Sequence, residues 1–429
     1  MSSSEKTGLH LEDLNYDCLA YILSFTTWLE RLYLEQLSTR FQPLVKDNFN
    51  AGETFDLDDI IEKASIDDTK TFLSRHGSQI KKISCKSLKS VNYLPYIELI
   101  PEYCNNLEEL VFHQLVNISY KGYSRIFRAN PNLQKIDLTD CFHITDRVCA
   151  QIAQLHHLTH LNLSNNWKFT GKHLEKLKNL KELLLNRCAI RSECMISICK
   201  AVQLKKLDIT LCNGLDEETY LTIVETQNEL ETLIISDTYE AMSEILMGLK
   251  NLNHLEIRFN NDTNLLGVLV EKKSKTLETL TLNSFGTVSP FVKDQISKLS
   301  NIRVLQLHTH SDLQNQFVDD EYLLEIAKNC SELRQFICPR AGLVTVEGVA
   351  AFVSFATNLE KVNFSYCDLT EQVYDDIVKI LEKEVGLRKP LRLCVYGTKI
   401  SPDFIKTSEY RSHRHLLTLC FDDHYSRKL

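Results

Sequence analysis

The chain has 429 residues, of which 43% are hydrophobic and 25% charged, with only 13 Gly and 8 Pro, a composition typical of a folded protein rich in regular structure. A single core stops growing at about 250–300 residues, so the length predicts several domains or an elongated array, and the net charge of −8 gives no basic excess for binding nucleic acid. Without an apolar signal segment in residues 1–10 or an apolar run of about 18 residues, we expect no membrane span, a cytoplasmic and/or nuclear location, and the 14 Cys as thiols.

The first predicted element is a small helical module over residues 9–50. Its apolar residues recur at helical spacing in two sets, which include Leu14, Leu19, Ile22 and Leu23 in the first and Leu34 and Leu37 in the second. A bundle of about 40 residues is too small to be very stable alone.

A repeated phrase follows: an apolar residue, two variable residues, an apolar residue, one variable residue and another apolar residue. Eleven copies start at Leu107, Leu133, Leu158, Leu180, Leu204, Leu230, Leu252, Leu277, Ile302, Leu333 and Leu359, at separations of 26, 25, 22, 24, 26, 22, 25, 25, 31 and 26 residues. Less regular copies lie at residues 55–57, 80–85 and 391–395. The alternation at the end of the phrase predicts a strand whose apolar side chains point into a repeat solenoid.

A bend position follows the strand in several copies and holds a Cys or an Asn, at Cys141, Cys188, Cys212, Cys367, Asn166 and Asn260. A small side chain there can turn inward and satisfy backbone groups at the bend. Most copies then continue into a helix. In one of them Thr145 or Asp146 can cap the helix, and Val148, Ile152 and Leu155 fall on one face.

These features resemble the cysteine-containing subclass of leucine-rich repeats, in which each repeat has one strand and one helix, and Cys104 and Cys330 match a second Cys position of that subclass. The resemblance covers residues 53–400 and implies an α/β fold, a solenoid with a curved parallel sheet and outer helices in about 12–13 repeats. We expect residues 401–429 to form a C-terminal cap or tail. Long gaps before Leu333 and Leu391 predict extra loops over residues 308–320 and 382–389.

The module upstream of these repeats resembles an F-box. The likeness lies in residues 14–19, in Tyr21-Ile-Leu-Ser-Phe25 and in Leu37-Ser-Thr-Arg-Phe41, although Asn15 replaces the family's usual Pro and Leu37-Ser38 its usual Val-Cys. The resemblance implies binding to a Skp-family adaptor, and through it to a cullin, by Leu14, Leu19, Ile22, Leu23, Leu34 and Leu37. A generic helical cap for the open end of the solenoid is the alternative.

The outward positions of the strands predict a second binding surface, for an unknown target protein. Because interface hot spots favour Arg, Arg258 is the best single candidate on this surface. The predicted target-binding residues are His160, Asn162, Glu182, Leu184, Lys206, Asp208, Ile234, Glu256 and Arg258.

Motifs for catalysis are missing from the sequence: it has no Gly-rich phosphate loop, no G-x-S-x-G, no H-E-x-x-H and no C-x-x-C. We therefore expect no catalytic residue, no metal ligand and no cofactor. The expected function is that of a non-catalytic substrate-recognition subunit of an SCF-type cullin ubiquitin ligase, which promotes ubiquitin-dependent proteasomal degradation. The alternative is a non-ligase interaction scaffold with a helical N-terminal cap.

Overall fold

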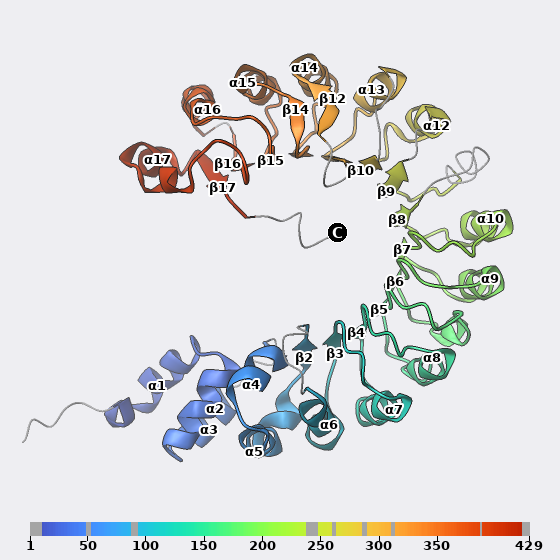
Figure 1. Cartoon of the computed structure of the whole chain (residues 1–429), viewed down its shortest axis with the longest axis vertical. Helices are drawn as coiled ribbons and strands as arrows, with labels where there is room; N and C mark the ends of the chain where they lie inside the picture. Colours follow the sequence, from blue (N-terminus) through green and yellow to red (C-terminus); the bar gives the residue numbers. More distant parts are fainter. Residues whose placement is uncertain are drawn as a thin grey trace, which may run out of the picture. The chain divides into compact units, whose positions relative to one another are not determined.

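Short parallel strands alternate with helices along most of the chain (Figure 1). The computed structural model describes residues 11–48, 53–86, 93–236, 248–259, 263–284, 290–309, 314–386 and 388–422. The chain divides into two units, Met1–Leu204 with Cys212–Leu215, and Lys205–Leu211 with Asp216–Leu429.

In the first unit, the strands pair in parallel in chain order from β1 to β6. They are β1 (Thr54–Asp56), β2 (Lys82–Cys85), β3 (Glu109–Phe112), β4 (Lys135–Asp137), β5 (His160–Asn162) and β6 (Glu182–Leu184). The helices between them lie on one side of the strand layer (Figure 1). They are α4 (Leu57–Lys63), α5 (Ile66–His76), η2 (Gly77–Gln79), α6 (Leu94–Tyr103), α7 (Tyr120–Ala129), α8 (Asp146–Ile152), η3 (Leu174–Lys176) and α9 (Ser192–Ala201).

The second unit repeats this arrangement, with its main strands in the order β7-β8-β9-β10-β11-β13-β15-β16-β17. Their bounds are β7 (Lys206–Asp208), β8 (Thr232–Ile235), β9 (His254–Phe259), β10 (Thr279–Ser284), β11 (Val304–Thr309), β13 (Gln335–Ile337), β15 (Lys361–Asn363), β16 (Leu391–Cys394) and β17 (Leu417–Cys420). The helices are α10 (Glu217–Thr226), α12 (Thr263–Lys273), α13 (Pro290–Ser297), α14 (Asp320–Asn329), α15 (Val346–Phe355), α16 (Gln372–Glu382), η4 (Pro402–Lys406) and α17 (Ser408–His413). Parallel strands in chain order, each linked to the next through helix or turn segments, make a leucine-rich-repeat solenoid, which confirms the expected fold class.

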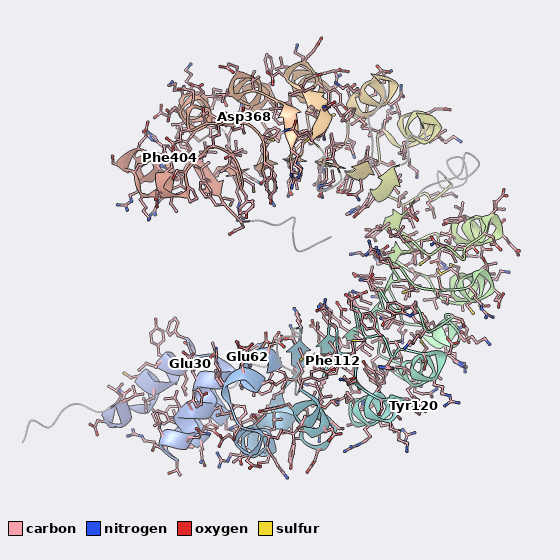
Figure 2. All side chains as sticks on the ribbon, viewed as in Figure 1. Glu30, Glu62, Phe112, Tyr120, Asp368 and Phe404 are labelled. Carbon is pink, nitrogen blue, oxygen red and sulfur yellow. The ribbon has the colours of Figure 1, made fainter. Side chains whose placement is uncertain are left out.

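The three apolar positions of the repeated phrase form the core between strands and helices. In β3 and the residues before it, Leu107, Leu110 and Phe112 are completely buried, and the equivalent residues of the other copies are buried as well. Phe112, labelled in Figure 2, extends from the strand into this layer. Burial of one such side chain contributes about 1.5–3 kcal/mol, so the phrase itself supplies much of the stability of each repeat.

Contacts between neighbouring repeats brace the starts of two helices. Thr145 occupies the N-cap position of α8 without a side-chain cap bond, and Asp146 reaches the next repeat, where it accepts hydrogen bonds from the backbone N and the Oγ1 of Thr170 at 2.8 and 2.9 Å. In the second unit, Asp320 accepts the same pair of hydrogen bonds from Thr345 at 2.9 and 2.6 Å. The acidic residue therefore joins two repeats, whereas the sequence pointed only to a cap of its own helix.

The extra loop expected at residues 308–320 is wrong in part, because it contains the strand β12 (Asn315–Asp319). This strand pairs in parallel with β14 (Ala341–Leu343) in a separate two-stranded sheet. Burial of Phe317 and Val318 stabilises it. The main sheet also continues past the expected boundary at residue 400, since β17 pairs with β16.

The N-terminal module consists of a 3₁₀ turn and three helices, η1 (Leu11–Asp13), α1 (Tyr16–Leu23), α2 (Trp28–Leu37) and α3 (Phe41–Asp47). Asn15 caps α1 by accepting a hydrogen bond from the backbone N of Cys18. Thr27 and Glu30 form a capping box at the start of α2, in which each side chain accepts from the other's backbone N. The predicted helical module is therefore present.

Helix α2 packs against the first repeat through an aromatic cluster. The Trp28 ring meets the rings of Phe55 and Phe72 edge-on, with centroids 5.7 and 5.9 Å away. The Arg31 guanidinium lies 4.8 Å from the Trp28 ring centroid and forms a 2.9 Å ion pair with Glu53. The module thus closes the apolar end of the solenoid.

A buried acid in α2 fixes the same contact. Glu35 accepts from His76 Nε2 at 2.5 Å and from Arg75 Nη1 at 3.0 Å, and the side chains of Glu35 and His76 are almost inaccessible to solvent. Breaking such a buried pair by removing one partner costs about 3–5 kcal/mol, because the other group stays buried without its partner. The need to keep Glu35 of α2 beside His76 of α5 therefore fixes the position of one helix on the other.

We predict that Trp28→Ala lowers the free energy of unfolding by about 3–5 kcal/mol, because it opens a cavity where the module meets the first repeat. Denaturant unfolding measures the change. Tyr21→Ala, on the exposed side of α1, is the matched control and is expected to stay within about 0.5 kcal/mol of the unmodified chain. Equal effects of the two substitutions would contradict the packing described here.

Candidate functional site

Strand register places residues from successive repeats in rows on the face opposite the helices. In the first unit, Glu109, Lys135, His160 and Glu182 are register partners in one row. A second row runs through Val111, Asp137, Asn162 and Leu184. Four of the predicted target-binding residues, His160, Asn162, Glu182 and Leu184, are therefore side by side.

These two rows enclose a shallow depression of about 180 Å³. It is lined by Glu109, Val111, Lys135, Ile136, Asp137, His160, Leu161, Asn162, Glu182 and Leu184. His160 lies against Glu182, with Nε2 and Oε1 3.2 Å apart. Sequence reasoning assigned four of these ten residues, and the same alternation in β3 and β4 is the signal for Glu109, Val111, Lys135 and Asp137.

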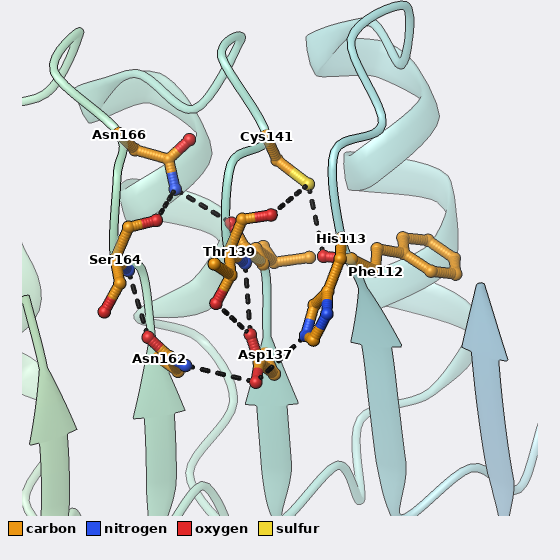
Figure 3. A network of polar contacts seen from close by, with 9 residues as sticks. Phe112, His113, Asp137, Thr139, Cys141, Asn162, Ser164 and Asn166 are labelled. Atoms are coloured by element: carbon orange, nitrogen blue, oxygen red, sulfur yellow. Dashed lines mark hydrogen bonds and ion pairs between the residues drawn. The ribbon is translucent and has the colours of Figure 1, made fainter. Parts of the chain in front are cut away.

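Asp137 is the centre of a polar network at the end of β4 (Figure 3). Its Oδ1 accepts from the backbone N and the Oγ1 of Thr139, at 3.1 and 2.6 Å. Its Oδ2 lies 3.1 Å from the donating Nδ2 of Asn162 and 3.2 Å from His113 Nε2. Two hydrogen bonds from Thr139, one from Asn162 and the adjacent His113 imidazole therefore meet at one carboxylate and join three adjacent repeats.

The network decides the charge of Asp137. Burial opposes the ionised form, but the hydrogen bonds from His113 and Thr139 together outweigh it and lower the pKa of Asp137 below its ordinary value. Asp208 occupies the corresponding place in β7 and accepts from the backbone N of Thr210 at 2.9 Å. There burial prevails and raises the pKa of Asp208.

The same side chains also form the turn after the strand. Asn162 Oδ1 accepts from the backbone N of Ser164 at 3.0 Å, as Asp208 does from Thr210 and Asn363 from Ser365. This Asx turn is a structural role for Asn162 and Asp208, in addition to the binding role predicted for them.

The bend side chains that follow these turns donate hydrogen bonds to the preceding repeat. The acceptors are backbone carbonyls at the ends of the preceding strands, in the pairs Cys141 to Phe112 (3.3 Å), Asn166 to Leu138 (2.8 Å), Cys188 to Leu163 (3.1 Å) and Cys212 to Leu185 (3.0 Å). This confirms the predicted function of the bend position, while Asn260 lies outside the described residues. The residue just before the bend has a positive φ in several repeats, for example 59° at Asp140 and 62° at Asn165.

The remaining predicted target-binding residues lie in the second unit. Lys206 is in one row of the strand face, and Asp208, Ile234 and Glu256 are register partners in the next row. Arg258 belongs to β9 and is the register partner of Asn283, but its side chain lies outside the described part of the structure.

The predicted adaptor-binding residues divide between the interior and the surface of the module. Leu19 and Leu23 are buried in its core, so their contribution is to hold α1 in place. Leu14, Ile22 and Leu34 are half-buried, and Leu37 is 76% exposed.

The structure adds two aromatic residues that sequence reasoning did not select. Tyr21 and Phe25 are 69% and 72% exposed, and their rings meet edge-on with centroids 4.9 Å apart. Tyr21 lies in the last turn of α1 and Phe25 in the turn just after it, and their spacing of four residues is the sequence signal that could have identified the pair. A pair of exposed aromatic side chains is a feature of protein-binding surfaces.

In the described ranges, no helix combines the length and the apolar character needed to span a membrane. Likewise, the described residues contain no group of three or more His, Cys, Asp or Glu side chains arranged to hold a metal ion.

Comparisons with known proteins give limited information. No protein-family model and no curated protein matches the sequence. A chain of the crystal structure of the Rad7 and Elc1 complex in yeast is similar at 14% identity and a TM-score of 0.48, with 98% of this chain and 100% of that chain covered. An internalin from Listeria monocytogenes is similar at 15% identity and a TM-score of 0.40, with 73% and 86% covered. Because these identities and TM-scores are low, the strand order and register themselves establish the leucine-rich-repeat fold.

We predict that Asp137→Asn destabilises the chain by about 1–3 kcal/mol near neutral pH, because half-buried donors lose their carboxylate acceptor. The folded pKa of Asp137 lies below its unfolded value, so its contribution is present above about pH 4 and is lost as the pH falls through the folded pKa. Denaturant unfolding at several pH values should show the two chains converging in acid. Asp140→Asn, in a left-handed turn position that Asn adopts readily, is the control.

Proposed function

We propose that this chain is the substrate-recognition subunit of an SCF-type cullin ubiquitin ligase, working in the cytoplasm and/or nucleus. The module at residues 11–48 binds a Skp-family adaptor, and the strand face binds a target protein. The chain performs no chemistry and promotes ubiquitin-dependent proteasomal degradation by holding the target near the ligase's catalytic partner. The observation that carries the proposal is the pairing of an exposed aromatic surface on the module with a separate polar strand face on the repeats.

The proposed adaptor surface consists of Tyr21, Phe25 and Leu37. A soluble protein seldom exposes such large apolar side chains together on one small module, and a partner would remove them from water. At about 25 cal/mol per Å² of apolar surface, two aromatic side chains supply several kcal/mol of association free energy. Leu14, Ile22 and Leu34 are half-buried and extend this surface.

Rigid attachment of the module supports a positioning role. The contacts of Trp28 with Phe55 and Phe72, together with the buried Glu35–His76 pair, fix the module on the first repeat. A target on the neighbouring strand face is then held at a defined distance from the adaptor, which raises the effective concentration of target at the ligase.

The same contacts favour a second candidate function, in which the module only caps a non-ligase interaction scaffold. Trp28 and Leu32 cover apolar side chains of the first repeat, as a capping element must. Deleting the module does not separate the two functions, because it uncovers Phe55 and Phe72 and threatens folding in both cases. Substitutions on the exposed side of the module do separate them.

We predict that the double substitution Tyr21→Ser with Phe25→Ser reduces capture of a Skp-family adaptor by at least about tenfold without lowering the unfolding midpoint, since both side chains are exposed. Co-purification with the adaptor measures binding. Phe355→Ser, at an exposed aromatic residue on α15, is the matched control and should bind normally. Failure of the unmodified chain to capture the adaptor would leave only the capping function.

We predict that Glu182→Lys reduces binding of the target, because it reverses a charge in the depression and removes the carboxylate beside His160. Affinity capture under proteasome inhibition compares this variant with the unmodified chain. Lys200→Glu, an exposed charge reversal on α9, is the control. A protein that binds the unmodified chain and both variants equally does not use the strand face.

A further inference from the structure

The last two strands bring two thiols together. Cys394 ends β16 and Cys420 ends β17, and the two residues are register partners. Neighbouring strands lie about 4.8 Å apart, within the Cα separation of about 4.4–6.8 Å that a disulfide spans. Both side chains leave the sheet on the face opposite the buried Leu393 and Leu419, because side chains alternate along a strand.

A cation contacts one of these sulfurs. Arg392 Nε donates to Cys420 Sγ, with the two atoms 2.7 Å apart. The bend cysteines have the opposite arrangement: the sulfurs of Cys188 and Cys212 donate to backbone carbonyls, which requires the S–H form. The Cys420 sulfur instead accepts a hydrogen bond from a guanidinium, and a cation beside a cysteine sulfur promotes its reaction as a nucleophile.

The partner, Cys394, is a completely buried thiol. Burial raises the pKa of Cys394 to about 11, and the neighbouring Cys420 raises it further, against the opposing charges of Lys361 and Arg392. The pair is therefore asymmetric, with one sulfur suited to attack an oxidant and the other suited to react afterwards.

We infer that Cys420 and Cys394 form a peroxide-responsive thiol pair, in which Cys420 reacts first and Cys394 closes a reversible disulfide between β16 and β17. This inference is independent of the proposed ligase function. It assigns a role to Arg392, whose exposed side chain is otherwise an ordinary surface group.

The chemistry uses hydrogen peroxide as the oxidant. The Cys420 thiolate attacks one peroxide oxygen, the O–O bond breaks, and hydroxide leaves and takes a proton from solvent, which gives a sulfenic acid and water. The Cys394 sulfur then attacks the Cys420 sulfur, the S–O bond breaks, and the hydroxyl leaves with the Cys394 proton as a second water. Two thiols are oxidised and one peroxide is reduced.

The position of the thiol pair explains how peroxide reaches Cys420 and what the disulfide would do to the chain. Cys420 is only 7% exposed, but it lies on β17, which pairs with β16 on one edge and with no other strand in the described part of the chain. Peroxide is small enough to reach such a site. The disulfide would tie the segment that contains η4 and α17 to the rest of the sheet and slow its opening. In a reducing compartment the bond would be transient, as sensing disulfides are.

The test treats the reduced full-length chain with a limited amount of hydrogen peroxide and follows every cysteine by non-reducing peptide mapping. We expect the Cys394–Cys420 linked peptide to appear first, while Cys338 and Cys367 stay reduced. Cys18 is the decisive internal reference, because it is exposed and would react first if exposure alone controlled the order. Oxidation of Cys18 ahead of Cys420 would overturn the inference.

Three variants test the mechanism. Arg392→Gln should slow oxidation of Cys420 by about tenfold, whereas Lys399→Gln, which removes an exposed cation paired with Asp368, should not. Cys394→Ser should stop the reaction at the sulfenic acid, which dimedone traps, and Cys420→Ser should abolish the response. An unchanged rate in Arg392→Gln would refute the role of the guanidinium. If a variant folds poorly, the order of oxidation in the unmodified chain still decides.

Discussion

Several repeats depend on one hydrogen bond, from the bend side chain to a strand-end carbonyl of the repeat before it. The chain must leave the strand within a few residues, and the carbonyls at that edge have no further strand residue to pair with. Cys141, Asn166, Cys188 and Cys212 satisfy them from inside the solenoid. The left-handed residue before the bend, such as Asp140 or Asn165, costs about 1–2 kcal/mol and directs the next side chain inward. The contact repeats from one strand to the next and therefore sets their register.

Register in turn creates the strand face that we propose binds a target. Glu109, Lys135, His160 and Glu182 are separated by 22–26 residues in the chain, yet parallel pairing places them in one row. The face is not independent of the fold, because Asp137 and Asn162 contribute to both the surface and the turns that end the strands. Substitutions at these two residues will therefore affect stability as well as binding, while Glu182 and Leu184 are freer to vary.

The N-terminal module shows how one helix serves two surfaces. Helix α2 directs Trp28 and Glu35 toward the first repeat and leaves Leu37 in solvent. Attachment through a buried carboxylate and an aromatic cluster is rigid, as the proposed role of holding two partners at a fixed separation requires. Capping and the proposed adaptor binding are thus compatible, because they use different residues of the same module.

The sequence alone determined the strands, the bend positions and the helical module, because these follow from local periodicity: the apolar positions recur at a period near 25, and each bend residue directly follows its strand. Tertiary structure decided what depends on distant partners. It buried Leu19 and Leu23 while exposing Leu37, since the inner face of each helix is chosen by what packs against it. It formed β12 where a loop was expected, because β12 pairs with residues 341–343. It also placed Arg392 against Cys420, a contact between side chains 28 residues apart that no local sequence pattern predicts.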